Sequence, residues 1–294
     1  EQFNDDKVLN TAPFEALRKG AAGFLVNLMN PALKWFHLEP SNWTVDGVKD
    51  DGQNSTSEYI ERLENFIFNV MSKSGSYRAF KKGFEHLLSM GFCCIIVHED
   101  KRFVAKAECI PIGTYALGVG SDGKVNRVCR RFAMTAEELV KEFGGGEEGL
   151  NALPQDVIQN WKSGNNGKDG NYIVENLIEP NEPTWACGTM EELDYGLSKK
   201  YAYRSIFWLR GRTSSGNSQQ TGNYSGILAV KGFRFNPIIA PRLDCELGSI
   251  YGRGRGHDAL NACRALQALM FDEIEISSNR AEPPLLASND LREE

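Results

Sequence analysis

Residues 251–286 read YGRGRGHDALNACRALQALMFDEIEISSNRAEPPLL, and this stretch decides the fold of the chain. Glycines alternate with arginines at its start, and a long run without glycine or proline then continues to Pro283 and Pro284. Glycine adopts backbone angles that other residues avoid and lets a second backbone approach closely. Asp258 suits the first turn of a helix, where a carboxylate interacts favourably with the helix dipole. The stretch therefore predicts a tight loop followed by one long helix over about 257–281.

Apolar residues recur along this helix at steps of three and four, so they share one face. The face consists of Leu260, Cys263, Leu266, Met270 and Ile274. The distal half of the helix is acidic, through Asp272, Glu273 and Glu275. Because the stretch contains no pair of nucleophile and base and no cluster of metal ligands, we interpret it as a structural strut that packs laterally against other helices.

The composition is that of a soluble globular chain with a modest negative charge. The 294 residues include 39 acidic and 33 basic side chains, a net charge of −6, which gives no support to a surface that coats nucleic acid. The seven cysteines are odd in number and lack CxxC spacing, which favours a reduced, intracellular protein over a disulfide framework. No apolar run is long enough to span a membrane. Since the chain starts at Glu1 and stops soon after Leu286, we expect a fragment of a longer protein.

The order of the predicted elements is helices, then strands, then the long helix, which favours an α+β fold over a parallel α/β sheet. Helical patterns occupy about 12–30, 57–72, 75–90, 135–144 and 154–161. Strand patterns occupy 33–38, 92–98, 105–117, 172–178, 203–209 and 227–235. The polar segment 211–226 has no aliphatic side chain, so we expect a mobile hairpin tip there.

Two other patterns in the sequence could mark a functional site. The loop 252–256 precedes a helix, as phosphate loops do, but its pattern is GxGxG rather than GxGxxG and no GK[ST] follows. Cys94 and His98 share one face of a predicted strand, and Cys109 could lie on the neighbouring strand, as in a metal or thiol site. A hinge loop and core packing are the favoured interpretations, so we expect no catalytic residue, metal or cofactor.

Several segments together resemble the head-to-tail connecting (portal) proteins of short-tailed, podovirus-type bacteriophages. The resemblance runs in order through most of the chain, although the polar segment 211–226 departs from the family pattern. Arg255 departs as well, because the family often has proline there. The segments that carry it are AAGFLVNLMNPALKWFHLEP (21–40), SYRAFKKGFEHLLSMGFCCIIVHED (76–100), FAMTAEELVKEFG (132–144), FRFNPIIAPRLDCELGSIYGRGRGHDAL (233–260) and AEPPLL (281–286).

The resemblance implies an α+β wing domain over 1–250, a loop and first stem helix over 251–282, and the truncated start of a clip over 283–294. It implies a non-enzymatic subunit of a ring, typically of 12 copies, at one vertex of the virion capsid. Double-stranded DNA would pass through the ring without sequence-specific binding during packaging and ejection. The apolar face of the long helix would then contact neighbouring subunits. Residues that would line the channel or form a hinge are Arg253, Arg255, Asp272, Glu273 and Glu275.

The partners that the resemblance implies are the terminase large subunit, tail adaptor proteins and capsid proteins, with assembly in the cytoplasm of the bacterial host and no membrane contact. Two rival hypotheses stay open at this point. One is a different structural or adaptor protein of the virion. The other is a phosphate-binding enzyme that uses the loop 252–256.

Overall fold

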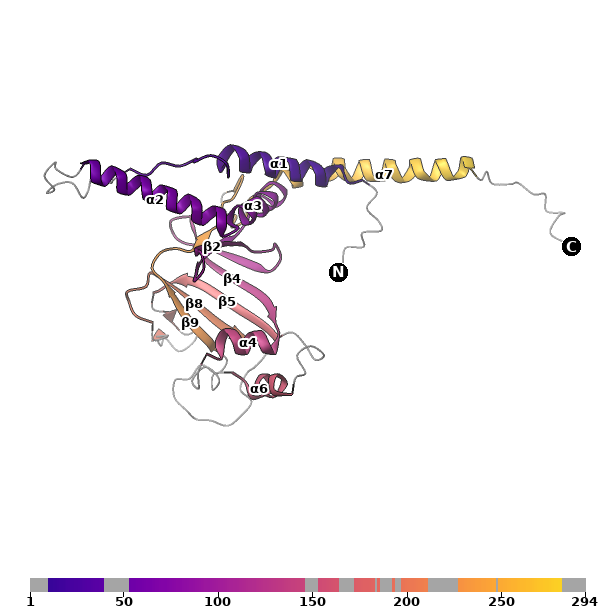
Figure 1. Ribbon diagram of the computed structural model, residues 1–294. Helices are drawn as coiled ribbons and strands as arrows, with labels where there is room; N and C mark the ends of the chain where they lie inside the picture. Colours follow the sequence, from indigo (N-terminus) through magenta and orange to yellow (C-terminus); the bar gives the residue numbers. More distant parts are fainter. Residues whose placement is uncertain are drawn as a thin grey trace, which may run out of the picture.

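The computed structural model describes most of the chain, and its outline is drawn in Figure 1. The described residues are 10–39, 53–145, 153–163, 172–182, 184–185, 192–193, 197–210, 227–246 and 248–281. The polar segment 211–226 and the residues 283–294 expected to begin the clip lie outside these ranges. None of the helices in the described ranges combines the length and apolarity that a membrane crossing requires.

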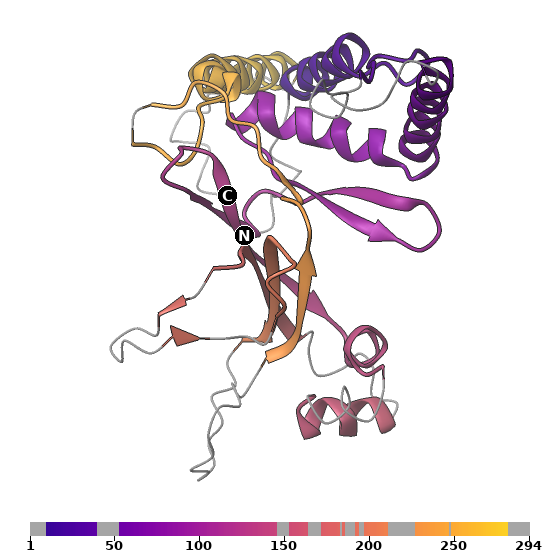
Figure 2. The same ribbon diagram turned by 90° about the vertical axis from the view of Figure 1, so that its left-hand side faces the viewer.

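Four helices lie along one side of the molecule: α1 (Ala12–Leu28), α2 (Gln53–Lys73), α3 (Ser76–Met90) and α7 (Arg255–Ala281) (Figures 1 and 2). Helix α1 packs on α3, with the rings of Phe24 and Phe84 5.9 Å apart. Helix α3 ends where predicted, because Gly91 adopts the left-handed conformation, with φ of 87°, that terminates many helices.

A three-stranded antiparallel sheet lies beneath these helices. Its strand order is β10 (Ile238–Ile239), β1 (Ile95–Asp100), β2 (Val104–Cys109). One face of this sheet packs on α3 through a buried cluster of Leu87, Cys93, Ile95 and Ala107. We call the four helices and this sheet the helical layer.

A five-stranded antiparallel sheet extends away from the helical layer (Figure 2). Its order is β3 (Tyr115–Val119), β4 (Val125–Met134), β5 (Tyr172–Pro180), β8 (Tyr203–Leu209), β9 (Ile227–Phe233). Two short helices, α4 (Ala136–Phe143) and α6 (Gln155–Lys162), cover one end of it around a core that includes Leu139, Val157, Val174 and Phe207. We call this sheet with α4 and α6 the sheet layer.

A small antiparallel pair, β6 (Thr184–Trp185) and β7 (Glu192–Leu193), completes the described strands. Every described ladder is antiparallel, and the helices are largely segregated from the sheets. The α+β fold predicted from the order of elements is therefore confirmed. The sequence predicts element ends correctly where a side chain forms hydrogen bonds with the neighbouring backbone. Thr135 and Glu138, for example, form the capping box that opens α4.

Three expectations about elements require correction. Residues 33–38 were expected to form a strand, but they have no strand partner among the described residues. The pattern over 105–117 is divided between β2 and β3 by a turn at 110–114. Helix α7 begins at Arg255, two residues earlier than predicted, so that Gly256 belongs to the helix.

A buried carboxylate explains why the segment 33–38 is not a strand. Glu64 of α2 is 2 % exposed and accepts hydrogen bonds from the Leu38 backbone N–H at 2.7 Å and from Lys34 Nζ at 3.0 Å. His37 Nδ1 lies 2.6 Å from the same carboxylate. The Leu38 N–H, followed by Lys34, lowers the pKa of Glu64. The segment is thus held by a helix side chain instead of a strand ladder.

We predict that this attachment weakens in acid. A carboxylate whose pKa is lowered by folding stabilises the folded state above its unfolded pKa, and this contribution is lost as pH falls through the folded pKa. The amide of Leu38 should therefore lose hydrogen-exchange protection, corrected for the intrinsic rate, between about pH 6 and about pH 3. Glu64→Gln should lower protection several-fold at neutral pH and remove its pH dependence. An unchanged protection factor in the variant would show that Glu64 does not hold the segment.

Candidate functional site

The glycines of the loop before α7 serve as points where two backbones cross. A Cβ atom on Gly252 would lie 2.2 Å from the Leu243 carbonyl oxygen and 2.3 Å from that of Gly91. A Cβ on Gly254 would lie 2.4 Å from the Gly91 nitrogen, and one on Gly91 would lie 2.3 Å from the carbonyl carbon of Arg253. Real Cβ atoms are not found so close to backbone. The loop therefore requires glycine to pass directly across the end of α3.

Backbone hydrogen bonds secure this crossing. The Leu243 N–H donates to the Gly91 carbonyl at 2.7 Å, and the Arg253 N–H donates to the Leu243 carbonyl at 2.9 Å. The Gly254 N–H donates to Nδ1 of His257 at 3.3 Å. A phosphate loop points such N–H groups at its ligand, whereas here they are directed at protein acceptors. The geometry therefore supports the hinge-loop interpretation over the phosphate site.

The two arginines of the loop are held by local carboxylates. Arg253 contacts Asp258 of the first turn of α7, with Nη2 to Oδ1 at 3.2 Å. Arg255 contacts Asp258 at 3.6 Å and Asp244 at 3.7 Å. All of these side chains are well exposed, and such surface pairs contribute only about 0–1 kcal/mol each. The pairs orient the loop against the start of α7.

Helix α7 has no buried residue along its 27 positions, all of which the structure describes. In the predicted apolar face, Cys263 and Met270 are half-buried, whereas Leu260, Leu266 and Ile274 are 43–55 % exposed. The half-buried side chains lie on the side where the Asn10 N–H donates to Gln267 Oε1 at 3.1 Å. Beyond this point α7 extends away from the rest of the chain (Figure 1).

A second apolar row on α7 was missed by the sequence reasoning. It consists of Ala262, Ala265, Leu269 and Ile276, whose spacing also follows steps of three, four and seven. At 100° per residue this row lies about 130° around the helix from the first row. Leu269 is 64 % exposed and Ile276 is 54 % exposed. Helix α7 is thus apolar on two faces, which a helix packed against a single core does not need.

The acidic residues of the distal half, Asp272, Glu273 and Glu275, are all exposed. The exposed ring of Phe271 lies among them in sequence, on the side of the first apolar row. The distal half therefore presents both charge and apolar surface to its surroundings.

The three residues of the alternative metal or thiol site are not brought together on one face. Cys94 lies in the core between the sheets, while Cys109 pairs with Ile95 and faces α3, where its Sγ is 3.6 Å from His86 Nδ1. Burial raises the pKa of Cys94 to about 12 and that of Cys109 to about 11, so both are thiols at neutral pH. Among the described residues no group of three potential metal ligands is assembled. Core packing accounts for these side chains.

Comparison with known proteins adds an independent line of evidence. The sequence model of the family described as "Bacteriophage head to tail connecting protein" matches residues 1–294. A "Portal protein" of Salmonella phage epsilon15 is 27 % identical over 291 residues, covering 97 % of this chain and 46 % of that protein. A "Probable portal protein" of Bordetella phage BPP-1 is 23 % identical over 283 residues, covering 95 % of this chain and 45 % of that protein. The chain therefore spans a little less than half the length of these relatives.

Gly254→Ala should destabilise the protein by about 3 kcal/mol, because the new Cβ must displace backbone rather than a movable side chain. Gly23→Ala is the matched control, since a Cβ in the middle of α1 meets no atom within 4 Å there. The control should raise stability by about 0.5–1 kcal/mol, the usual gain of alanine over glycine in a helix. Chemical denaturation of both variants provides the measurement. If Gly254→Ala is as stable as the parent, the crossing is not tight.

Proposed function

The chain belongs to the bacteriophage head-to-tail connecting protein family, and we propose that it supplies the wing and the first stem helix of a portal subunit. In this proposal residues 1–250 form the wing, 251–282 the loop and stem helix, and 283–294 the start of the clip. The assembled protein forms a ring of 12 subunits at one vertex of the virion capsid. The match of the family model to the whole chain supports the assignment to the family.

The observation that carries the assembly role is the exposure of α7. A helix of 27 residues with no buried side chain and two apolar faces is only weakly covered by its own body. A ring is closed by heterologous contacts, in which each subunit uses two different surfaces for its two neighbours. The first row (Leu260, Cys263, Leu266, Met270 and Ile274) and the second row (Ala262, Ala265, Leu269 and Ile276) supply two such surfaces on one helix.

The distal acids of α7 suit a conduit for DNA. Asp272, Glu273 and Glu275 repel phosphate, so a channel near them would not retain the duplex by tight binding. Arg253 and Arg255 are engaged with carboxylates at the base of the helix, which favours their hinge role over a place in the channel. The partners in this proposal are the terminase large subunit, tail adaptors and capsid proteins, with assembly in the bacterial cytoplasm.

We further propose that the chain has no catalytic activity of its own, because its glycine loop and its thiols are used for packing. Purified full-length protein should hydrolyse neither ATP nor DNA above the level of a mock preparation. ATPase or nuclease activity that a point substitution in this chain abolishes would contradict this expectation.

Electron microscopy of the full-length protein tests the proposed function directly, since a portal must form rings with a hole wide enough for duplex DNA. Leu269→Asp and Ile276→Asp should prevent ring closure, as should Leu266→Asp on the first row. Burial of each of these side chains is worth about 1.5–3 kcal/mol, and aspartate forfeits it. Ala268→Asp is the matched control on the same helix, because the exposed Ala268 lies about 90° from the centre of the second row and about 140° from that of the first.

Amide exchange over residues 92–130 should be unchanged in these variants, which separates failed assembly from unfolding. Normal rings formed by both Leu269→Asp and Ile276→Asp would show that the second row is not a subunit contact.

A further inference from the structure

The helical layer and the sheet layer meet over an apolar contact on one side. Cys94 and Ile96 of the helical layer are fully buried against Val128 and Ile178 of the five-stranded sheet. The loop before α7 adds to this side, because Tyr251 Oη accepts a hydrogen bond from the Leu117 N–H at 3.2 Å. Among the described residues this contact contains no ion pair and consists mainly of apolar side-chain packing, so small rotations about it would disturb few directional bonds.

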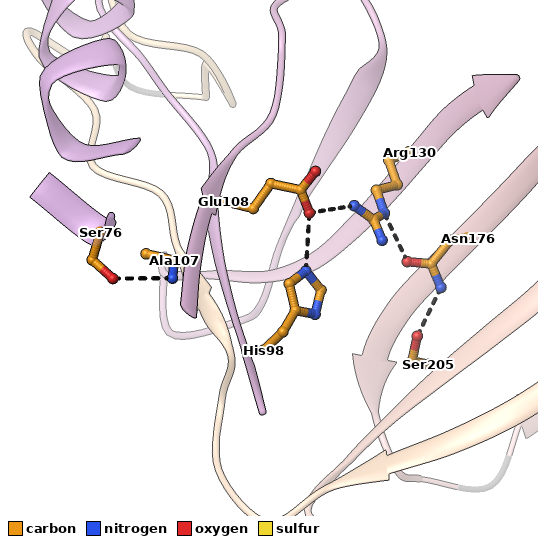
Figure 3. Close-up of polar contacts among 7 residues, drawn as sticks. All are labelled: Ser76, His98, Ala107, Glu108, Arg130, Asn176 and Ser205. Carbon is orange, nitrogen blue, oxygen red and sulfur yellow. Dashed lines mark hydrogen bonds and ion pairs between the residues drawn. The ribbon is translucent and has the colours of Figure 1, made fainter. Parts of the chain in front are cut away.

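The junction is also joined by charge, directly beside this contact, because Glu108 pairs with Ile96 across the ladder of β1 and β2. Oε2 of Glu108 in β2 accepts a hydrogen bond from Nη1 of Arg130 in β4 at 3.3 Å. His98 Nε2 lies 3.3 Å from the same carboxylate oxygen (Figure 3). Among the described residues, Glu108–Arg130 is the one ion pair that joins the three-stranded sheet to the five-stranded sheet. The contact with His98 and the charge of Arg130 lower the pKa of Glu108 to about 2, so the carboxylate is ionised at physiological pH.

Arg130 is held in place from within the sheet layer. Its Nε donates to Asn176 Oδ1 at 3.1 Å, and Asn176 Nδ2 donates to Ser205 Oγ at 2.7 Å (Figure 3). Asn176 is 0 % exposed and Ser205 is 2 % exposed. The guanidinium also lies 4.9 Å from the centre of the Phe132 ring. A buried network of this kind fixes one orientation of the arginine before it meets Glu108.

A cavity of about 490 Å³ lies next to Arg130, lined mainly by β4, α4, β8 and β9 of the sheet layer and by two residues of β1. His98 and Glu99 line it from the helical layer, and Arg130, Phe143 and Phe207 are among its lining residues from the sheet layer. The cavity is partly open to solvent, so the side chains of the two layers are not close-packed there. The cavity therefore provides room for the layers to approach or separate on the charged side.

The chain passes between the layers through short segments. Residues 110–114 connect β2 to β3, and residues 234–237 connect β9 to β10. Both segments adjoin the apolar contact, since Ile110 and Ile238 belong to the same buried cluster. The ion pair lies close to the first of these connections, because Glu108 is two residues before Ile110.

We propose that Glu108 and Arg130 form a latch that sets the tilt of the sheet layer against the helical layer, with the apolar contact as the hinge. The pair is too exposed to add much stability, because the Glu108 side chain is 52 % exposed. Its geometric role follows from its position beside the apolar contact and at the edge of the cavity, because Glu108 pairs with Ile96 and Arg130 lies two residues from Val128. Since α7 is anchored to the helical layer, the latch determines how the sheet layer is held relative to α7.

Spin labels on the full-length protein test the latch. Labels carried by keto amino acids at Lys81 of α3 and Lys141 of α4 report the distance between the layers, and labels at Lys141 and Lys162 report a distance within the sheet layer. Dilution with unlabelled protein restricts the measurement to single chains, so the result does not depend on ring closure. The parent protein should give one narrow distribution for each pair.

Glu108→Gln should broaden the distribution between the layers by about twofold or more, or shift its maximum, and leave the distribution within the sheet layer unchanged. Arg130→Lys should do the same, because lysine cannot contact Asn176 and Glu108 as a fork. Glu99→Gln is the matched control: it removes the same charge from the same sheet at an exposed position and should have no effect. Unchanged distances in both latch variants, with only a lower unfolding temperature, would overturn the proposal. Equal broadening in Glu99→Gln would also overturn it.

Discussion

The crossing of two backbones at Gly91, Gly252 and Gly254 is the constraint on which the rest of the structure depends. In most packed segments, side chains keep the two backbones apart. At this crossing the two backbones touch each other directly, so only glycine fits. The crossing sets where α7 leaves the body, because the helix begins one residue after Gly254. It also sets the direction of α7, since hydrogen bonds join Arg253 of the loop to Leu243 and Leu243 to Gly91.

From this crossing, a series of contacts connects α7 to the distant sheet layer. Helix α3 ends at the crossing and packs on β1 and β2 through Leu87 and Ala107. Ser76, at the other end of α3, accepts a hydrogen bond from the Ala107 N–H at 3.3 Å (Figure 3). Glu108, the residue after Ala107, forms an ion pair with Arg130 of the five-stranded sheet. A displacement of the sheet layer can thus reach α7 through packed elements and one ion pair, which joins the proposed assembly surface to the proposed latch.

The parts of the fold that depend on local chemistry were predictable from the sequence. The glycine loop, the long helix, the end of α3 at Gly91 and the capping box at Thr135 all follow from residues acting on neighbouring backbone. The parts that depend on distant partners were not. Residues 33–38 alternate like a strand, yet Glu64, some 26 residues away from Leu38, supplies the hydrogen bond that a strand would have made. The latch unites β2, β4, β5 and β8, and nothing in their local patterns indicates that these residues meet.

The second face of α7 was missed for a different reason. A single periodic series accounts for a helix that packs on one core, and the series from Leu260 to Ile274 leaves out Leu269 and Ile276. Their exposure matters because α7 stands clear of the body, which a local pattern does not reveal (Figure 1). These exposed apolar residues matter because the distal part of α7 lacks tertiary packing within the subunit. Without tertiary packing, helices in water are only marginally stable. If neighbours cover both faces, the free energy that orders α7 is released at assembly rather than at folding. The ordering of the helix and the closing of the ring would then be one cooperative step, and the exposed rows are the surfaces through which the subunits would be coupled.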